Sequence, residues 1–341
     1  MDASTVVNTT TAAKATMVAK AVTVRDLGLT VLADPAGATV DIMFIHGLQG
    51  HPRTTWLYSS PDGKSEKPKK SIFSRLSKSR KKPESQVTEE TEETKPLEAF
   101  WPLDILPRDF PHARIMTYGY DSNITHWFKG PAMQLDIDQY GESLLNTMEA
   151  GRRGNPHRPL ILIAHNLGGL ILKDSLRRAK NTREERFKNV YKSIAALLFF
   201  RTPHRGGSYV ELGLTVRKFA HLAGLNTNER ILRSLSFNST FARVLEEEFA
   251  HVLTDLKPRL FVFQEGLGLT GFRPLSGKVV EDVSSVLDVG EQKDTIVADH
   301  INMCRFSGAD DDGYIKVKAA LGLVMSEILP RPTSRQGMVP V

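Results

Sequence analysis

The sequence is poor in cysteine, since Cys304 is the only one among 341 residues. A single thiol excludes an internal disulfide and favours a reducing, intracellular and cytoplasmic setting. Long apolar runs are also missing: no stretch approaches the roughly 18 apolar residues of a membrane span, and we expect no signal peptide. No zinc-type Cys/His spacing, nucleic-acid motif or internal repeat is present. We therefore expect no metal, no cofactor and no nucleic-acid partner.

One segment of the chain concentrates charged residues, first basic and then acidic. The net charge is +6, yet residues 64–82 carry nine Lys or Arg and residues 84–93 carry five Glu. Such a stretch is typical of a solvated loop, so we predict a disordered insertion at about 57–98. The alternative is a basic patch at 64–82 that binds an anionic membrane surface or directs nuclear import.

Apolar runs and helical patterns alternate along the rest of the chain, which predicts a mostly parallel sheet flanked by helices. We expect one domain over 28–328, with a flexible tail at 1–27 and another at 329–341. The N-terminal tail weakly resembles a mitochondrial transit peptide. Strands are predicted at 28–32, 39–45, 113–118, 159–164, 193–200, 259–263, 278–280 and 294–298, and helices at 134–152, 167–179, about 208–253 and 312–328.

Residues 164–169 read Ala-His-Asn-Leu-Gly-Gly and form a turn between a predicted strand and a predicted helix. In the nucleophile-elbow pattern G-x-S-x-G, small residues flank the nucleophile because the strained turn leaves no room for larger ones. Ala164 and Gly168 supply the small positions, but Asn166 stands where the serine belongs. An amide nitrogen is not a useful nucleophile. His165 is expected to pack within the turn and not to act as a base. The motif thus indicates hydrolase architecture and puts hydrolase activity in doubt.

Acyl transfer needs a base and an orienting acid in addition to the nucleophile. In sheets with this elbow the order along the chain is nucleophile, acid, histidine. Asn166, Glu265 and His300 keep that order. Glu265 directly follows a predicted strand, and His300 lies at the turn after the last one. Glu281 and Asp282 remain alternative candidates for the acid.

The oxyanion of such a reaction is bound by two backbone N–H groups, one after the nucleophile and one after an early strand. Those groups are expected to be Leu167 and Leu48, and the loss of the serine removes neither. Gly47 lets the second loop turn closely. His46 and Thr202 also follow predicted strands, so they should lie at the same sheet edge as the elbow.

Further segments strengthen the pattern around the elbow. They are 41–56, 100–101, 106–121, 164–169, 202–208 and 298–300. Together they resemble the lipase-like serine esterase domain of fungal NACHT and ankyrin-repeat proteins and of the serine-active-site-containing protein family, over about residues 28–328. The resemblance implies an α/β-hydrolase fold, a carboxylic ester or lipid-like ligand, and association with mitochondria or the endoplasmic reticulum. A protein partner is a further expectation.

Two positions depart from that family. The family has serine at 166, and at 201 it usually has a small residue where this chain has Arg201. A long cation beside the site is expected either to block it or to hold an anion. Three hypotheses follow: a degenerate hydrolase that still binds a ligand, a non-hydrolytic lyase or cyclase that uses His300 and the oxyanion donors, and an active serine esterase in which asparagine was introduced deliberately.

Overall fold

The structure is a computed structural model that describes residues 22–60, 98–122, 133–202, 239–266, 291–298 and 302–328. The strands are β1 (Gly28–Ala33), β2 (Val40–Ile45), β3 (Leu57–Ser59), β4 (Glu98–Phe100), β5 (Ala113–Gly119), β6 (Leu160–His165), β7 (Ile194–Phe200), β8 (Arg259–Glu265) and β9 (Glu291–Ile296). The helices are α1 (Trp101–Asp104), α2 (Leu106–Asp109), α4 (Met133–Arg152), α5 (Leu167–Asn181), α6 (Glu185–Lys192), α9 (Ser239–Leu256) and α10 (Asp312–Ile328), with a 3₁₀ turn at Asn302–Cys304.

Seven strands form the main sheet, in the order β1-β5-β2-β6-β7-β8-β9. All neighbouring pairs are parallel except the edge pair β1–β5. After β2 the chain moves outward to β5 and then crosses back to β6 on the other side of β2. The strand order therefore reverses between β2 and β6, and the carboxyl ends of these two strands define the crevice where ligands bind in open α/β sheets.

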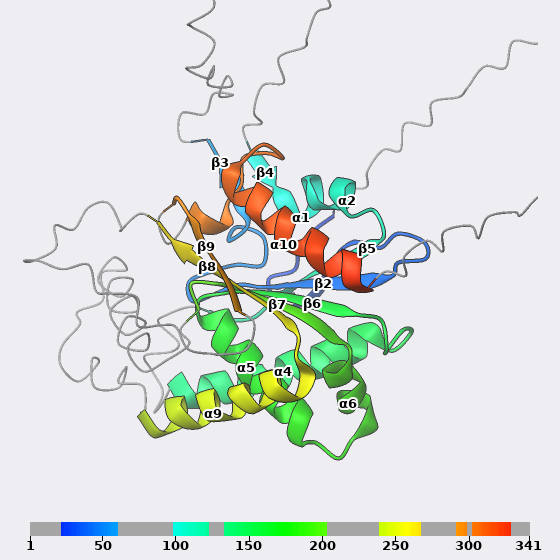
Figure 1. The fold of residues 1–341 in the computed structure, drawn as a ribbon, viewed down its shortest axis with the longest axis vertical. Coiled ribbons are helices and arrows are strands. Elements are labelled where there is room, and N and C mark those ends of the chain that lie inside the picture. Colours follow the sequence, from blue (N-terminus) through cyan, green and yellow to red (C-terminus); the bar gives the residue numbers. More distant parts are fainter. Residues whose placement is uncertain are drawn as a thin grey trace, which may run out of the picture.

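Helices cover both faces of the sheet (Figure 1), with α4, α5, α6 and α9 on one face and α1, α2 and α10 on the other. The buried strand residues separate accordingly. In β2, Met43 and Ile45 pack into the core beneath α4 and α5, whereas Ile42 and Phe44 pack into the core beneath α10. Successive side chains of a strand point to opposite faces, so a fully apolar strand supplies both cores at once.

The second core is built around aromatic rings. Phe44 lies edge-on to Trp56 at 5.1 Å and to Trp101 at 5.0 Å between ring centroids. The short antiparallel pair β3–β4 brings the two tryptophans together, because β3 follows Trp56 directly and β4 precedes Trp101 directly. Val22 and Val24 also pack against this core, within the range assigned to the N-terminal tail.

The α/β class with a mostly parallel, helix-covered sheet is confirmed. Several details differ from expectation. The strand predicted at 294–298 lies at 291–296, the ends of the insertion predicted at 57–98 form β3 and β4, and α6 was not predicted. The strand predicted at 278–280, and the helical stretch before residue 239, lie outside the described residues.

Close packing of α5 on β2 yields the first prediction. A Cβ added at Gly168 would lie 2.2 Å from the backbone oxygen of His46, so Gly168→Ala must push the helix off the strand. We expect a loss of roughly 2–3 kcal/mol in the free energy of unfolding, measured by urea denaturation. Gly322 in α10 is the matched control, because a Cβ there meets nothing within 4 Å. Gly322→Ala should stabilise by up to about 1 kcal/mol. Equal effects of the two substitutions would contradict this packing.

Candidate functional site

The turn between β6 and α5 holds Asn166 in a strained backbone conformation, with φ 50° and ψ −120°. Three hydrogen bonds fix this turn. The Asn166 N–H donates to the Phe200 oxygen at 2.9 Å, and the Asn166 oxygen accepts from the Gly169 N–H at 3.0 Å and from the Thr202 hydroxyl at 3.3 Å. A non-glycine residue in this region is uncommon and costs on the order of 1–3 kcal/mol. A strained turn between a strand and a helix is the conformation that the nucleophile-elbow pattern leads one to expect at this position.

Small residues surround the elbow as the motif requires. A Cβ added at Gly47 would lie 2.9 Å from the Cβ of Asn166, and one at Gly169 would lie 2.2 Å from the Thr202 side chain. The ring and carbonyl of buried His165 also lie against Gly47. The β2 loop and the elbow are therefore in direct contact. His165 packs there, and Thr202 braces the turn.

His46 is buried completely and is held in one protonation state by its surroundings. Its Nδ1 lies 3.0 Å from the Gly47 oxygen, so Nδ1 carries the proton, and its Nε2 accepts from the Tyr120 N–H at 3.3 Å. The ring stacks on Tyr120, with 4.3 Å between centroids. Burial lowers the pKa of His46 to about 4; the Gly47 bond opposes this and His51 adds to it. A neutral imidazole with both nitrogens engaged anchors the loop, and its Nδ1 proton is held by the Gly47 oxygen instead of being offered to a substrate.

The two expected oxyanion donors lie on either side of this contact. Leu48 follows Gly47 in the β2 loop, and Leu167 is the first residue of α5; both are buried. Within the described part of the chain, neither backbone N–H has a hydrogen-bond partner. Buried N–H groups are almost always paired, so two unpaired donors beside a strained turn suit an oxygen anion of a ligand.

Arg201 and Glu265 form an ion pair at the same sheet edge. The register places Phe200 beside Phe263, so the residues that follow β7 and end β8 are neighbours. Nη1 of Arg201 contacts Oε1 of Glu265, with side chains 29% and 15% exposed. Arg201 itself has a left-handed φ of 40°, and its N–H donates to the Phe263 oxygen at 3.0 Å. The side chain of Arg201 therefore reaches the expected triad acid.

Some of the expected site residues are not among those that the structure describes. His300, Glu281 and Asp282, and the basic stretch 64–82, lie outside the described residues. Ala298 and Asn302, on either side of position 300, line a cleft of about 540 Å³. Across the described ranges, no helix is long and apolar enough to span a membrane.

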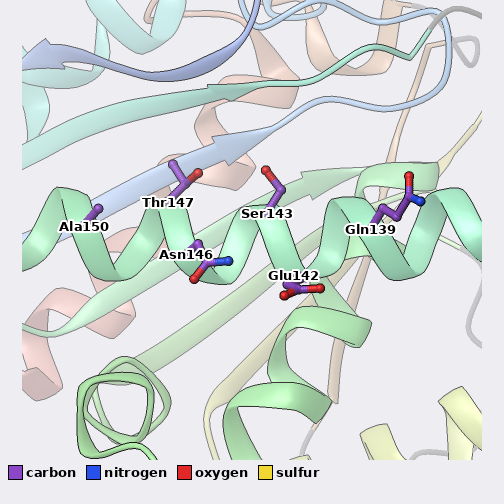
Figure 2. A pocket seen from close by; sticks show the side chains of 6 residues that line it. All are labelled: Gln139, Glu142, Ser143, Asn146, Thr147 and Ala150. Atoms are coloured by element: carbon purple, nitrogen blue, oxygen red, sulfur yellow. The ribbon is translucent and has the colours of Figure 1, made fainter.

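Cys304 and Ser143 are two side chains of nucleophilic type away from the turn at Asn166. Cys304 is fully buried, and burial raises the pKa of its thiol well above the ordinary value, so it is not a nucleophile. Ser143 lines a groove of about 500 Å³ along α4 (Figure 2), in which all six lining residues come from one helix. Its hydroxyl accepts a hydrogen bond from Tyr118 at 3.0 Å. Neither residue lies on a strained turn.

Sequence reasoning missed two features of the site. The Tyr120 hydroxyl donates to the His46 oxygen at 2.9 Å, and the Tyr120 ring stacks on the imidazole. In the sequence, only the position of Tyr120 directly after a strand indicated a place at the site. The pairing of Arg201 with Glu265 was also not predicted, although both residues follow or end adjacent apolar strands.

Comparisons with known proteins find relatives of low sequence identity. No family model matches the chain. Protein SERAC1 of Bos taurus and of Homo sapiens is 26% and 25% identical over 268 residues, which is 78% of this chain and 36% of theirs. The chain thus spans about a third of the length of these relatives.

Two solved structures are among those to which the chain is similar. One, from work on carboxylesterases of Nitrososphaera gargenis, has 10% identity and a TM-score of 0.43, and covers 88% of this chain and 96% of its own. The NocB thioesterase domain from the nocardicin cluster has 11% identity and a TM-score of 0.38, with 88% and 99% covered. The mostly parallel sheet with helices on both faces, described above, has the arrangement of the α/β-hydrolase fold.

The buried His46 makes stability depend on pH. Because its folded pKa is about 4 and its unfolded pKa about 6.5, the unfolded chain binds a proton first as the pH falls. Stability is therefore full above pH 6.5 and is lost between pH 6.5 and 4, by about 3 kcal/mol. Urea denaturation from pH 7 to 4 should show a smaller loss for His46→Gln. The control His157→Gln, at an exposed histidine, should lose as much unfolding free energy between pH 7 and 4 as the unmodified protein. An identical pH dependence of the unfolding free energy in all three proteins would contradict the assignment.

Proposed function

We propose that the protein is an α/β-hydrolase-fold domain of carboxylic ester or lipid hydrolase ancestry that binds such a ligand but has lost hydrolysis. The observation that carries this proposal is the backbone of Asn166, with φ 50° and ψ −120°. A chain with no need to present residue 166 would gain stability by relaxing this turn. The strained turn is retained, and the N–H groups of Leu48 and Leu167 have no partner among the described residues; both features support a site that still receives an oxygen-rich ligand.

Loss of chemistry follows from the side chain at the elbow. Serine attacks a carbonyl carbon because a histidine removes its proton as the bond forms, and the acid orients that histidine. The Asn166 amide has no lone pair of comparable reactivity, because its nitrogen is conjugated with the carbonyl. In this proposal Glu265 and His300 are the remaining acid and base, with Glu281 and Asp282 as alternative acids.

The pair of Arg201 and Glu265 supports a second change at the site. A triad carboxylate works by accepting the imidazole N–H and by stabilising the positive ring that forms. A guanidinium on Oε1 of Glu265 competes for that carboxylate and offsets its negative charge. Arg201 is therefore proposed to weaken the Glu265 acid, which is a second cause of lost hydrolysis beside the missing serine.

A non-hydrolytic reaction of lyase or cyclase type is the second candidate. The unpaired N–H groups of Leu48 and Leu167 favour it, because they would stabilise an enolate or alkoxide without any covalent step. In this case His300 would act as the base by itself. The two proposals separate on His300→Ala, which abolishes conversion by a lyase and leaves ligand binding by a degenerate hydrolase.

The proposal extends to binding partners and location. A small ester or lipid-like ligand fits the oxyanion donors, and the basic stretch at 64–82 would suit an anionic membrane surface. An intracellular location, with association to mitochondria or the endoplasmic reticulum, and a protein partner remain proposals.

Restoring the serine tests the proposed ancestry. Removal of a triad nucleophile costs on the order of a million-fold in kcat, so Asn166→Ser should raise hydrolysis of short- and medium-chain p-nitrophenyl esters by roughly a thousand-fold or more. Asn146→Ser, at an exposed position of α4, is the matched control and should change nothing. Adding His300→Ala to Asn166→Ser should return the rate to baseline. Equal rates for Asn166→Ser and the control would reject the proposal.

The role of Arg201 is tested in the serine background. Asn166→Ser combined with Arg201→Gly should hydrolyse esters about tenfold faster than Asn166→Ser alone, because the Glu265 carboxylate is released. Lys257→Gly is the control for backbone relief, since Lys257 also has a left-handed φ, of 48°, at the end of α9. Glycine at either position should relieve about 1 kcal/mol of strain. A rate gain also seen with Lys257→Gly, or absent with Arg201→Gly, would remove Arg201 from this role.

A further inference from the structure

Three arginines surround one buried aspartate at the amino-terminal edge of the sheet, opposite the elbow. Asp41 is the second residue of β2 and is fully shielded from solvent. Its Oδ2 accepts from Nε of Arg152 at 2.8 Å, and its Oδ1 accepts from Nη1 of Arg158 at 2.9 Å. Nη1 of Arg114 lies 4.0 Å from the same Oδ1. One carboxylate is thus shared by three guanidinium groups.

Arg152 is the interior member of this cluster and is fully engaged. It also donates to the Ser193 hydroxyl at 2.8 Å and to the Arg158 carbonyl oxygen. Burial lowers the pKa of Arg152, while Asp41 opposes that shift. Arg152 and Arg158 therefore share the single negative charge of Asp41, which leaves the three guanidinium groups with one buried counterion between them.

The outer arginines are poorly compensated. Their side chains are 15% and 12% exposed, so their charges are largely removed from water. Among the described residues, the other acid that pairs with Arg114 is Asp34, which is 58% exposed and lies 3.6 Å from Nε of Arg114. An exposed carboxylate at this distance contributes little. Nε of Arg114 is buried and has no hydrogen-bond partner in the described part of the chain. Such a group is costly unless a ligand or solvent completes it.

These arginines open into a cleft of about 490 Å³. One wall is the turn 34–38 between β1 and β2, and the other is the turn that follows α4, with Gly154 and Asn155. Arg114 comes from the start of β5 and Arg158 from the segment before β6, so two adjacent turns and two strand starts converge on one polar hollow. This placement needs nothing from the elbow site.

We propose that this cleft binds a phosphate group, through Arg114 and Arg158, either as free phosphate or as the monoester of a small molecule. Guanidinium groups match phosphate oxygens with pairs of parallel hydrogen bonds, and they bind this group better than lysine does. A dianion balances the two outer charges, which a single carboxylate does not. The volume exceeds that of inorganic phosphate, so a small esterified group also fits.

Thermal unfolding and calorimetric titration of the full chain test the site. Inorganic phosphate and glycerol phosphate are each compared with sodium chloride at the same ionic strength. A ligand specific to the folded state should raise Tm by about 3 °C or more at saturation and should bind with one-to-one stoichiometry. The tighter of the two phosphates identifies the free or the esterified form. If chloride raises Tm as much as phosphate does, the effect is screening and the proposal fails.

A charge placed in the cleft provides the decisive variant. Asn155 is exposed and lines the cleft, so Asn155→Asp adds a built-in anion beside the arginines without removing any of their bonds. We expect a higher Tm without ligand and at least a tenfold loss of phosphate affinity. Asn146→Asp, exposed on α4 outside the cleft, is the matched control and should bind phosphate like the unmodified protein.

A second variant keeps the charge and changes the geometry. Arg114→Lys retains a cation but loses the planar fork, so affinity should fall about fivefold. If Asn155→Asp and Arg114→Lys both bind phosphate normally, phosphate binds elsewhere on this basic protein and the proposal is overturned. Because none of these measurements uses ester hydrolysis, the result is independent of the function proposed for the elbow.

Discussion

The site depends on one close contact, that of the β6–α5 turn with the loop after β2. A Cβ at Gly168 would collide with the backbone of His46, and one at Gly47 would collide with Asn166. The contact therefore exists only because both segments carry glycine where they meet. This contact lies between β2 and β6, where the strand order reverses. The fold therefore leaves a crevice at the place where the β6–α5 turn and the loop after β2 approach each other.

Most of what such a site needs is supplied by the backbone. The strained φ of Asn166, the two unpaired N–H groups and the buried His46 anchor depend on chain path and burial, not on the side chain at 166. A serine can be lost there without disturbing the frame. The two cores reinforce this rigidity from both faces of the sheet, because α5 and α10 each pack on alternate residues of the same central strands.

The two edges of the sheet differ in electrostatic character. At the carboxyl edge, Arg201 and Glu265 neutralise each other beside the elbow. At the amino edge, Asp41 serves three arginines and leaves positive charge facing a cleft. Partial or full removal from water strengthens the Coulomb attraction in both arrangements relative to an exposed pair, while desolvation of the charges opposes this gain. Each edge therefore has its own chemistry, separated by the full length of the strands.

The sequence predicted the helices and turns that are determined by neighbouring residues in the chain. The helix 312–328 and the turn between β6 and α5 were placed correctly because apolar periodicity and small-residue spacing are properties of contiguous residues. The strands β3 and β4 were not predicted, since each has three residues and pairs across a long insertion. Strand β9 was shifted because Glu291–Ile296 is largely polar and gains its position from pairing with β8.

The charged pairs could not be predicted for a related reason. Arg201 and Glu265 are far apart in the sequence and meet only because β7 and β8 are neighbours. Asp41 meets Arg152 and Arg158 across more than a hundred residues. An ion pair of this kind follows from the strand order, which the alternation of strands and helices does not specify.

The most direct test of the central claim, an intact elbow that lacks only its nucleophile, is covalent labelling. Asn166→Ser is treated with a fluorophosphonate and its intact mass is measured, with the unmodified chain as control. The account predicts one adduct, located at residue 166, on the serine variant and none on the unmodified chain. A serine variant that remains unlabelled while folded would show that the elbow no longer activates a nucleophile, and it would contradict the account.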